Sequence, residues 1–224
     1  MRQKLENNQM RVFITARLPE DVLARIAREH SVEAHSEDIP IGRQKLLAGV
    51  EGKDGLLCTL TDRIDREVLE RAPDLKIIAN NGDGFDEIDI EAATRKAIPV
   101  TNTPGVSTNS VADLAFALIL ATARRLVEGD RMTRGAEFKF WAPFHFLGWD
   151  VSGRTLGIVG FGSIGKAVAR RAAGFDMKVT YFSSPRLEKY EEDRSGVTFA
   201  PLDQLLKDSD LYRCTYLFDH KLTT

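Results

Sequence analysis

The sequence predicts an α/β protein built from two parallel-sheet domains. Short apolar or β-branched runs alternate with helical patterns from Arg11 onward, which is typical of parallel strands covered by helices. A long apolar helical pattern after Asn109 interrupts this alternation, and the alternation restarts at Thr155 with a glycine-rich turn between a strand and a helix. We therefore expect a first domain at residues 1–105 and a second at residues 106–224.

Composition limits the function classes. The chain has 224 residues, 43% of them hydrophobic and 29% charged, enough for a substantial core. Its 31 basic and 33 acidic residues are interspersed and give a net charge of -2, so the sequence lacks the basic surface of a nucleic-acid or membrane-surface protein. We expect no nucleic-acid partner, and any anionic ligand must be held by a local site.

Cysteine content and apolar runs indicate the compartment. Cys58 and Cys214 are too few for a disulfide framework or a cysteine metal cluster, so we expect a reducing compartment and no metal site. The first ten residues, MRQKLENNQM, have no apolar core and do not resemble a signal peptide. The longest apolar run, Leu114 to Ala123, is about half a membrane span. The sequence therefore predicts a cytoplasmic protein with no membrane partner.

The first domain is predicted to be flavodoxin-like. Three segments have helical patterns, and they are LPEDVLARIAREH, TDRIDREVLERAPDL and DEIDIEAATRKAIPV. Five segments are expected to be strands, and they are Val12 to Thr15, Val32 to Ala34, Leu56 to Leu60, Leu75 to Ala79 and Pro99 to Asn102. Five strands that alternate with helical segments in the first hundred residues are most simply a flavodoxin-like domain.

The segment TNTPGVSTNS is expected to end the first domain. Pro104 and Gly105 predict a turn, and the hydroxyl of Ser107 or Thr108 can cap the following helix. That helix is expected to run from about Asn109 past Leu126 and to be mostly buried, because its sequence is apolar on nearly every side.

The stretch LGIVGFGSIGKAVARR, residues 156–171, resembles two phosphate-binding loops. Gly160, Gly165 and Lys166 nearly match the loop of nucleotide triphosphatases. That loop needs a hydroxyl after its lysine to hold magnesium, and Ala167 stands there instead. A phosphotransferase that uses Lys166 is therefore disfavoured.

The same stretch matches the turn of a dinucleotide-binding Rossmann unit. A strand is expected at Thr155 to Val159, a helix from Ser163 to about Gly174 and a second strand at Lys178 to Phe182. The first glycine allows the tight turn, the second lets the backbone approach a pyrophosphate, and the third allows close helix packing. The pyrophosphate would sit on the helix N-terminus. The predicted cofactor-binding residues of this turn are Gly160, Gly162, Ser163, Ile164 and Gly165.

The end of the second strand bears on the choice of cofactor. NAD sites usually place an acidic residue there, about 20 residues past the glycines, to bind the ribose 2′-hydroxyl. Here the sequence reads TYFSSPR, so Ser183, Ser184 and Arg186 occupy that corner without a carboxylate. Hydroxyls and a guanidinium suit a 2′-phosphate. The sequence favours NADP, with NAD as the alternative.

Two long segments resemble the D-isomer-specific 2-hydroxyacid dehydrogenases, in particular their glyoxylate and hydroxypyruvate reductases. They are NNGDGFDEIDIEAATRKAIPVTNTPGVSTNSVADLAFALILATARRL and GWDVSGRTLGIVGFGSIGKAVARRAAGFDMKV, and the resemblance runs from about Val12 to Asp210. It implies a substrate domain, an inserted cofactor domain and hydride transfer to a small 2-keto acid. It also implies a homodimer, to which the long helix and the aromatic arm near Trp141 contribute.

The resemblance assigns the substrate loop. The segment NGDGF matches the family loop whose backbone N–H groups bind the substrate carboxylate, which gives Asp83 and Gly84 as substrate-binding residues beside Gly82. Fixed, uncharged backbone donors suit this role. We expect the Asp83 side chain to point away from the substrate, because a carboxylate pointing inward would repel it.

The resemblance also implies a catalytic arginine, a histidine and a glutamate in the second half of the cofactor domain, and no residue of this chain matches them. The sequence around each histidine and around two arginines does not match the family's catalytic motifs. These residues are His30, His35, His145, His220, Arg134 and Arg154.

The last residues depart from the family pattern. After Asp210 a strand rich in Val and Ile is expected, but the sequence reads LYRCTYLFDHKLTT, with Arg213 in mid-strand. We expect a C-terminally truncated chain, for which a frameshift near Asp210 would account, with a genuine short variant that has a frayed tail as the alternative. The alternative function is a catalytically inactive NAD(P)-binding or dimerisation module.

Overall fold

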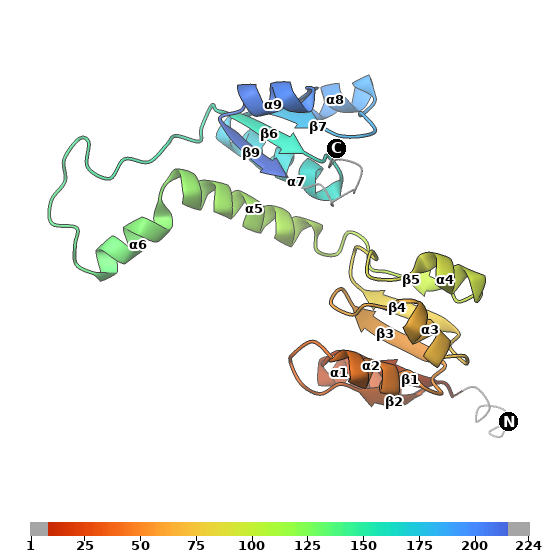
Figure 1. Cartoon of the computed structure of the whole chain (residues 1–224). Helices are drawn as coiled ribbons and strands as arrows, with labels where there is room; N and C mark the ends of the chain where they lie inside the picture. The colour runs from red at the N-terminus through yellow and green to blue at the C-terminus, as the bar shows by residue number, and fades with distance from the viewer. Residues whose placement is uncertain (1–8, 215–224) are drawn as a thin grey trace. The chain divides into compact units, whose positions relative to one another are not determined.

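The computed structural model describes residues 9–214, so His220 lies outside the described residues. The chain divides into two compact units, Met1–Val106 and Ser107–Thr224. Each unit has its own parallel sheet and its own core (Figure 1). In the described part of the chain, no helix combines the length and the apolar character needed to cross a membrane.

The first unit is a five-stranded parallel sheet with strand order β2-β1-β3-β4-β5, which confirms the flavodoxin-like expectation. Its elements are β1 (Arg11–Ile14), α1 (Glu20–Ala27), β2 (Ser31–Ala34), α2 (Arg43–Gly49), β3 (Gly55–Thr59), α3 (Arg66–Arg71), β4 (Ile77–Asn81), α4 (Ile90–Arg95) and β5 (Val100–Thr101). The order brings the carboxyl ends of β3, β4 and β5 side by side, and the loop predicted to bind substrate follows β4.

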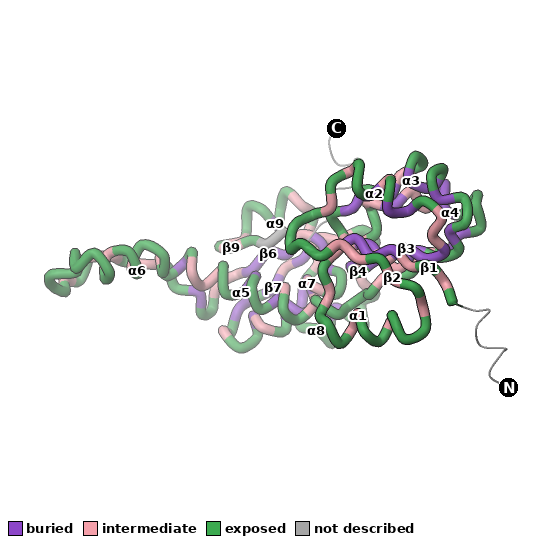
Figure 2. The backbone as a smooth tube through the Cα atoms, turned by 90° about the horizontal axis from the view of Figure 1, so that it is seen from below, coloured by how far each residue is buried: buried purple, intermediate pink, exposed green. Residues whose placement is uncertain are grey.

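The core of the first unit lies between the sheet and helices α2, α3 and α4. Leu56 and Cys58 of β3 are buried together with Val68 and Leu69 of α3 (Figure 2). The Asp65 carboxylate caps α3 by accepting from the backbone N–H of Val68. Helix α2 is not among the three segments expected to be helical.

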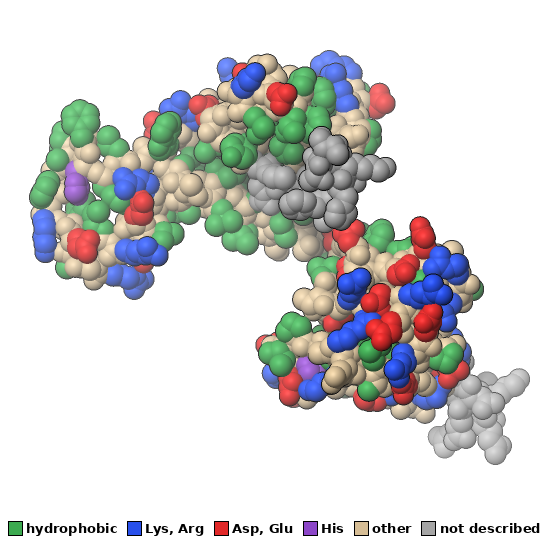
Figure 3. Space-filling model, viewed as in Figure 1, with side chains coloured by type: hydrophobic (Ala, Val, Ile, Leu, Met, Phe, Trp, Pro, Cys, Tyr) green, Lys and Arg blue, Asp and Glu red, His purple; other side chains and the backbone are tan. Residues whose placement is uncertain are grey.

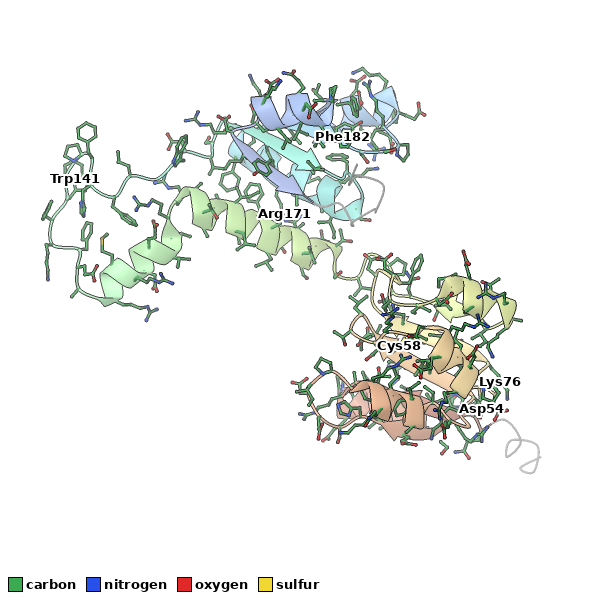
Figure 4. All side chains as sticks on the ribbon, in the orientation of Figure 1. Asp54, Cys58, Lys76, Trp141, Arg171 and Phe182 are labelled. Carbon is green, nitrogen blue, oxygen red and sulfur yellow. The ribbon has the colours of Figure 1, made fainter. Side chains whose placement is uncertain are left out.

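A charge cluster joins three strands at the opposite, amino-terminal edge of this sheet. Asp54 accepts hydrogen bonds of 2.9 Å from both the backbone N–H and Nε of Arg11, and its other oxygen lies 2.9 Å from Nζ of Lys76 (Figure 4). The hydrogen bonds from Arg11 hold the pKa of the Asp54 carboxyl well below its usual range. Strand β4 starts just beyond this cluster, at Ile77; the strand expected from Leu75 was placed two residues too early, because Leu75 lies in the turn after α3.

The second unit is a four-stranded parallel sheet with strand order β8-β7-β6-β9. Its elements are α5 (Thr108–Ala123), α6 (Leu126–Arg134), β6 (Thr155–Val159), α7 (Ser163–Ala172), the 3-10 turn Ala173–Phe175, β7 (Lys178–Phe182), α8 (Lys189–Ser195), β8 (Val197–Phe199), α9 (Leu202–Asp208) and β9 (Leu211–Cys214). The predicted bounds of β6 and β7 are confirmed. The segment after Asp210 forms a strand despite its polar sequence, with Arg213 beside Ile158 of β6.

Helices α5 and α7 cover one face of the second sheet, and α9 packs on the other face. Arg171 of α7 donates at 2.6 Å to Asp113 of α5 and at 3.1 Å to the carbonyl of Asn109, which fixes the two helices together (Figure 4). On the other face, the missing side chain at Gly157 leaves room for Leu205 of α9. The glycine-rich turn therefore starts from a strand that is covered on both faces.

The expectation of one long, mostly buried helix was wrong. Helix α5 ends at Ala123, and Arg125 has a left-handed backbone with φ 54° before α6 begins. The helix is apolar on every side, but only one side of it packs against the core. Leu114 and Leu118 on the other side are exposed. The predicted cap was also wrong: the Ser107 side chain makes no capping hydrogen bond, and Thr108 Oγ1 is buried without a partner among the described residues.

Helix α6 and residues 135–149 form an arm, which we call the aromatic arm. It leaves the core at Ala123 and returns where the backbone N–H of Trp149 donates to the Ala123 carbonyl at 2.7 Å. The Arg125 guanidinium lies 4.4 Å from the centre of the Phe146 ring. No residue of α6 is buried, and hydrophobic side chains cover much of the surface of the arm (Figure 3).

Candidate functional site

The backbone of the glycine-rich turn agrees with the role that the sequence predicts for each of its three glycines. Gly160 has φ 88°, in the left-handed region, and its N–H donates to the Phe182 carbonyl at 2.8 Å. A Cβ at Gly165 would lie 2.4 Å from the Gly160 carbonyl oxygen, so helix and turn meet backbone to backbone. A Cβ at Gly162 would meet no atom within 4 Å, so the turn is open on that side.

Helix α7 begins directly on this turn. Gly162 is the extended N-cap, and Ser163 and Ile164 form the first turn, where backbone N–H groups have no partner within the helix. These groups and the helix dipole favour an anion. Lys166 lies 3.5 Å from the Glu191 carboxylate and Ala167 is fully buried, so neither supports the triphosphatase alternative.

The corner after β7 holds a buried carboxylate that sequence reasoning missed. Arg186 donates from Nε to Glu192 at 2.7 Å and from Nη2 at 2.9 Å, and its guanidinium lies 4.7 Å from the centre of the Phe199 ring. Glu192 is only 2% exposed and also accepts from the Tyr181 hydroxyl at 2.8 Å. Ser183 and Ser184 precede this cluster, and their hydroxyls make no hydrogen bond within the described residues.

The electrostatics of this corner follow from these contacts. The hydrogen bonds from Arg186, and then from Tyr181, lower the pKa of Glu192 to about 2. Burial raises the pKa of Tyr181, and its hydroxyl remains a donor to Glu192 while accepting from the N–H of Leu187 at 3.0 Å. Arg186 is thus held as a cation in a fixed orientation, with its side chain still 54% exposed.

The carbonyl groups of the loop predicted to bind substrate accept hydrogen bonds from neighbouring residues. The Gly82 carbonyl accepts from the Thr103 N–H at 2.9 Å, the Asp83 carbonyl from Asn102 Nδ2 at 2.7 Å and the Gly84 carbonyl from Asn80 Nδ2 at 2.8 Å. In the described residues, the N–H groups of Asp83, Gly84 and Phe85 have no acceptor. The loop therefore presents three neighbouring donors.

The side chain of Asp83 is half-buried and makes no hydrogen bond or ion pair within the described residues. Its direction relative to a bound substrate stays a prediction. Sequence reasoning named the loop but missed Asn80 and Asn102, since an asparagine at the end of a strand has no specific pattern.

Four of the histidines and arginines that were given no catalytic role make local contacts, while His30 Nδ1 is buried without a partner among the described residues. His35 pairs its Nε2 with the Ile39 carbonyl at 3.1 Å, and the His145 ring lies 5.2 Å from the ring of Phe140. Arg134 donates to Asp130 at 2.8 Å within α6, and Arg154 lies 3.7 Å from Asp210. Over residues 9–214, no three acidic, histidine or cysteine side chains gather in a way that could hold a metal ion.

Comparisons with known proteins identify the family. Residues 12–184 match the model of the D-isomer specific 2-hydroxyacid dehydrogenase catalytic domain. The glyoxylate reductase of Pyrococcus furiosus is 48% identical over 204 residues, which cover 89% of this chain and 60% of that protein. This chain therefore spans about 60% of the length of that relative.

Solved structures give the same result. The TT0316 protein of Thermus thermophilus is 42% identical with a TM-score of 0.85, and the match covers 95% of this chain and 66% of that one. The D-lactate dehydrogenase of Aquifex aeolicus, solved with NAD and lactic acid, is 26% identical with a TM-score of 0.78, over 94% of this chain and 62% of that one. With its flavodoxin-like unit, its glycine-rich turn and these matches, the chain belongs to the D-isomer-specific 2-hydroxyacid dehydrogenase family.

Proposed function

We propose that this chain carries the substrate-binding domain and the first half of the cofactor-binding domain of an NAD(P)-dependent oxidoreductase. Its reaction reduces a small 2-keto acid, such as glyoxylate or hydroxypyruvate, to the 2-hydroxy acid. The observation that carries the proposal is the loop of three N–H donors at Asp83, Gly84 and Phe85 in a chain of this family. The name of the P. furiosus relative, glyoxylate reductase, supports the choice of substrate.

The substrate loop suits a carboxylate for a physical reason. The three backbone donors belong to peptide groups whose carbonyls are held by the fold, so little reorganisation is needed when an anion binds. A small 2-keto acid anchored by its carboxylate would have its carbonyl carbon held in one orientation, and such positioning is a large part of catalysis.

The cofactor site fits a dinucleotide on its phosphate side. The open side of Gly162 admits a pyrophosphate to the backbone, and Ser163, Ile164 and Gly165 place the first N–H groups of α7 beside it. The nicotinamide of such a cofactor supplies the hydride. The D-lactate dehydrogenase structure contains NAD, so the preference for NADP rests on Ser183, Ser184 and Arg186 of this chain.

Arg186 is expected to select NADPH over NADH. Replacing it with alanine removes a charged donor from the 2′-phosphate and should weaken NADPH binding about tenfold, with NADH binding unchanged. Titration of both cofactors against the Arg186→Ala variant measures this, and Arg170→Ala, an exposed arginine on α7, is the matched control for lost charge. Arg186 also pairs with the buried Glu192, so the unfolding temperature of the variant is measured first. Equal losses for NADPH and NADH in a variant that stays folded would contradict the NADP preference.

The catalytic arginine, histidine and glutamate implied by the family have no matching positions in this chain, so turnover needs a protein that carries them. We expect a chimera, in which the segment that follows the matched region of the P. furiosus glyoxylate reductase is joined after Asp210, to oxidise NADPH with glyoxylate or hydroxypyruvate. The 224-residue chain itself should bind NADPH saturably without turnover. A chimera that turns over no short 2-keto acid with either cofactor would refute the proposed reaction.

One alternative is a catalytically inactive NAD(P)-binding or dimerisation module. In that case the 224-residue chain would bind cofactor as well, but the chimera would be inactive. Cofactor titration and turnover therefore have to be measured on both proteins.

We also propose a homodimer and a cytoplasmic location. The dimer is supported by the exposed rings of the aromatic arm and by the exposed leucines of α5. A reducing compartment is supported by the cysteine content: the chain has two cysteines, and Cys58 is a buried thiol whose pKa is raised to about 12 by burial, so it is chemically inert.

A further inference from the structure

We infer that Asn80 and Asn102 are positioning residues, which orient the Gly82–Phe85 loop so that its N–H groups receive the substrate carboxylate. The inference rests on the proposed function and adds two residues to it. Neither side chain has to touch substrate. Both act on the loop by donating hydrogen bonds to the carbonyl oxygens of Asp83 and Gly84.

The geometry of the peptide bond links each held carbonyl to one free donor. In a trans peptide the C=O and the following N–H point in opposite directions. Holding the Asp83 carbonyl therefore turns the Gly84 N–H away from Asn102, and holding the Gly84 carbonyl turns the Phe85 N–H away from Asn80. The bond from Thr103 to the Gly82 carbonyl does the same for the Asp83 N–H. Each of the three consecutive peptide groups is thus held by its carbonyl, with its N–H on the opposite side.

The Asn80 amide is itself held in one orientation. The residue is 2% exposed, and its Nδ2 also donates to Glu87 Oε1 at 2.6 Å, so both of its N–H groups have acceptors. Its Oδ1 lies 3.8 Å from the Cys58 sulfur, which stays protonated and donates to it. Amide oxygen and nitrogen are therefore assigned by their partners, and the NH2 group faces the loop.

The two anchors come from different strands. Asn80 belongs to β4 and Asn102 follows β5, so the loop is fixed to the sheet at two points distant in sequence from each other. A loop without these anchors would have to lose conformational freedom when the anion binds, and that loss weakens affinity. Losing one anchor should therefore weaken carboxylate binding and leave the cofactor unaffected.

The test uses oxalate, a small carboxylate with no reducible carbonyl, and the 224-residue chain. In wild type, oxalate should shift the amide NMR signals of Asp83, Gly84 and Phe85 more than those of other residues. Asn102→Asp keeps the shape but replaces the donor with an acceptor, and it should raise the oxalate Kd about tenfold while the NADPH Kd stays unchanged. Asn81→Asp is the matched control, because this exposed neighbour adds the same charge near the loop but makes no side-chain hydrogen bond within the described residues.

The outcomes separate the inference from the proposed function. If oxalate shifts the three amides but Asn102→Asp and Asn81→Asp weaken it equally, the positioning role is wrong and the carboxylate site stands. If oxalate shifts amides elsewhere, or none, both the substrate loop and its positioning residues are refuted. Should Asn102→Asp fail to fold, Asn102→Ser, which keeps a shorter donor, replaces it, with a smaller loss expected for the same reason.

Discussion

Replacement of Gly165 by valine is expected to lower the affinity for NADPH at least about a hundredfold, or roughly 3 kcal/mol. Even the first carbon of any side chain would lie 2.4 Å from the Gly160 carbonyl oxygen and 3.4 Å from the side chain of Ile158. The clash involves backbone that cannot rotate away, so α7 has to move off the turn. That movement displaces the N–H groups that would bind the pyrophosphate.

A control glycine lies at the far end of the same helical segment. A Cβ at Gly174 would meet no atom within 4 Å, so Gly174→Val makes the same chemical change without a clash. It should keep wild-type affinity in a fluorescence titration, and Gly165→Ala should fall between wild type and Gly165→Val. Wild-type NADPH binding by Gly165→Val would show that the turn does not form the cofactor site.

The elements around this turn could be predicted because their signals are local. The bounds of β6 and β7 follow from short apolar runs beside glycines, and the left-handed Gly160 needs no information from elsewhere in the chain. The strand order of the first unit is the order of the flavodoxin-like domain that the five predicted strands indicated.

What could not be predicted depends on side-chain contacts that leave no pattern in the sequence. The break after α5 lies in an apolar helical sequence, and Arg125 adopts its left-handed backbone where its guanidinium meets the Leu147 carbonyl at 3.3 Å and the Phe146 ring. Glu192 looks like a surface residue of a charged helix, but it is buried because Tyr181 and Arg186 converge on it. The same reason hid Asn80 and Asn102, whose acceptors are backbone carbonyls of a loop and carry no sequence signal.

Removing two rings from the aromatic arm is expected to convert the proposed homodimer into a monomer. Phe144 is 89% exposed and Trp141 is 78% exposed, so their apolar surface faces water in the single chain. Figure 4 labels Trp141 on the arm. Large aromatic side chains are the commonest anchors of protein interfaces, and each contributes about 2 kcal/mol or more when it is buried there. The Trp141→Ser, Phe144→Ser double variant should therefore weaken association at least about a hundredfold.

Sedimentation velocity over a range of concentrations measures the change, and Tyr190→Ser provides the control. Tyr190 is also an exposed aromatic residue, at 72%, but it lies on α8 and outside the arm, so its loss should leave the dimer intact. The arm residues make few contacts with the core of their own unit, and the double variant should keep the wild-type unfolding temperature. A wild-type protein that stays monomeric at high concentration would refute the dimer. A dimer that is unchanged in the double variant would instead move the interface away from the arm, to the exposed leucine face of α5.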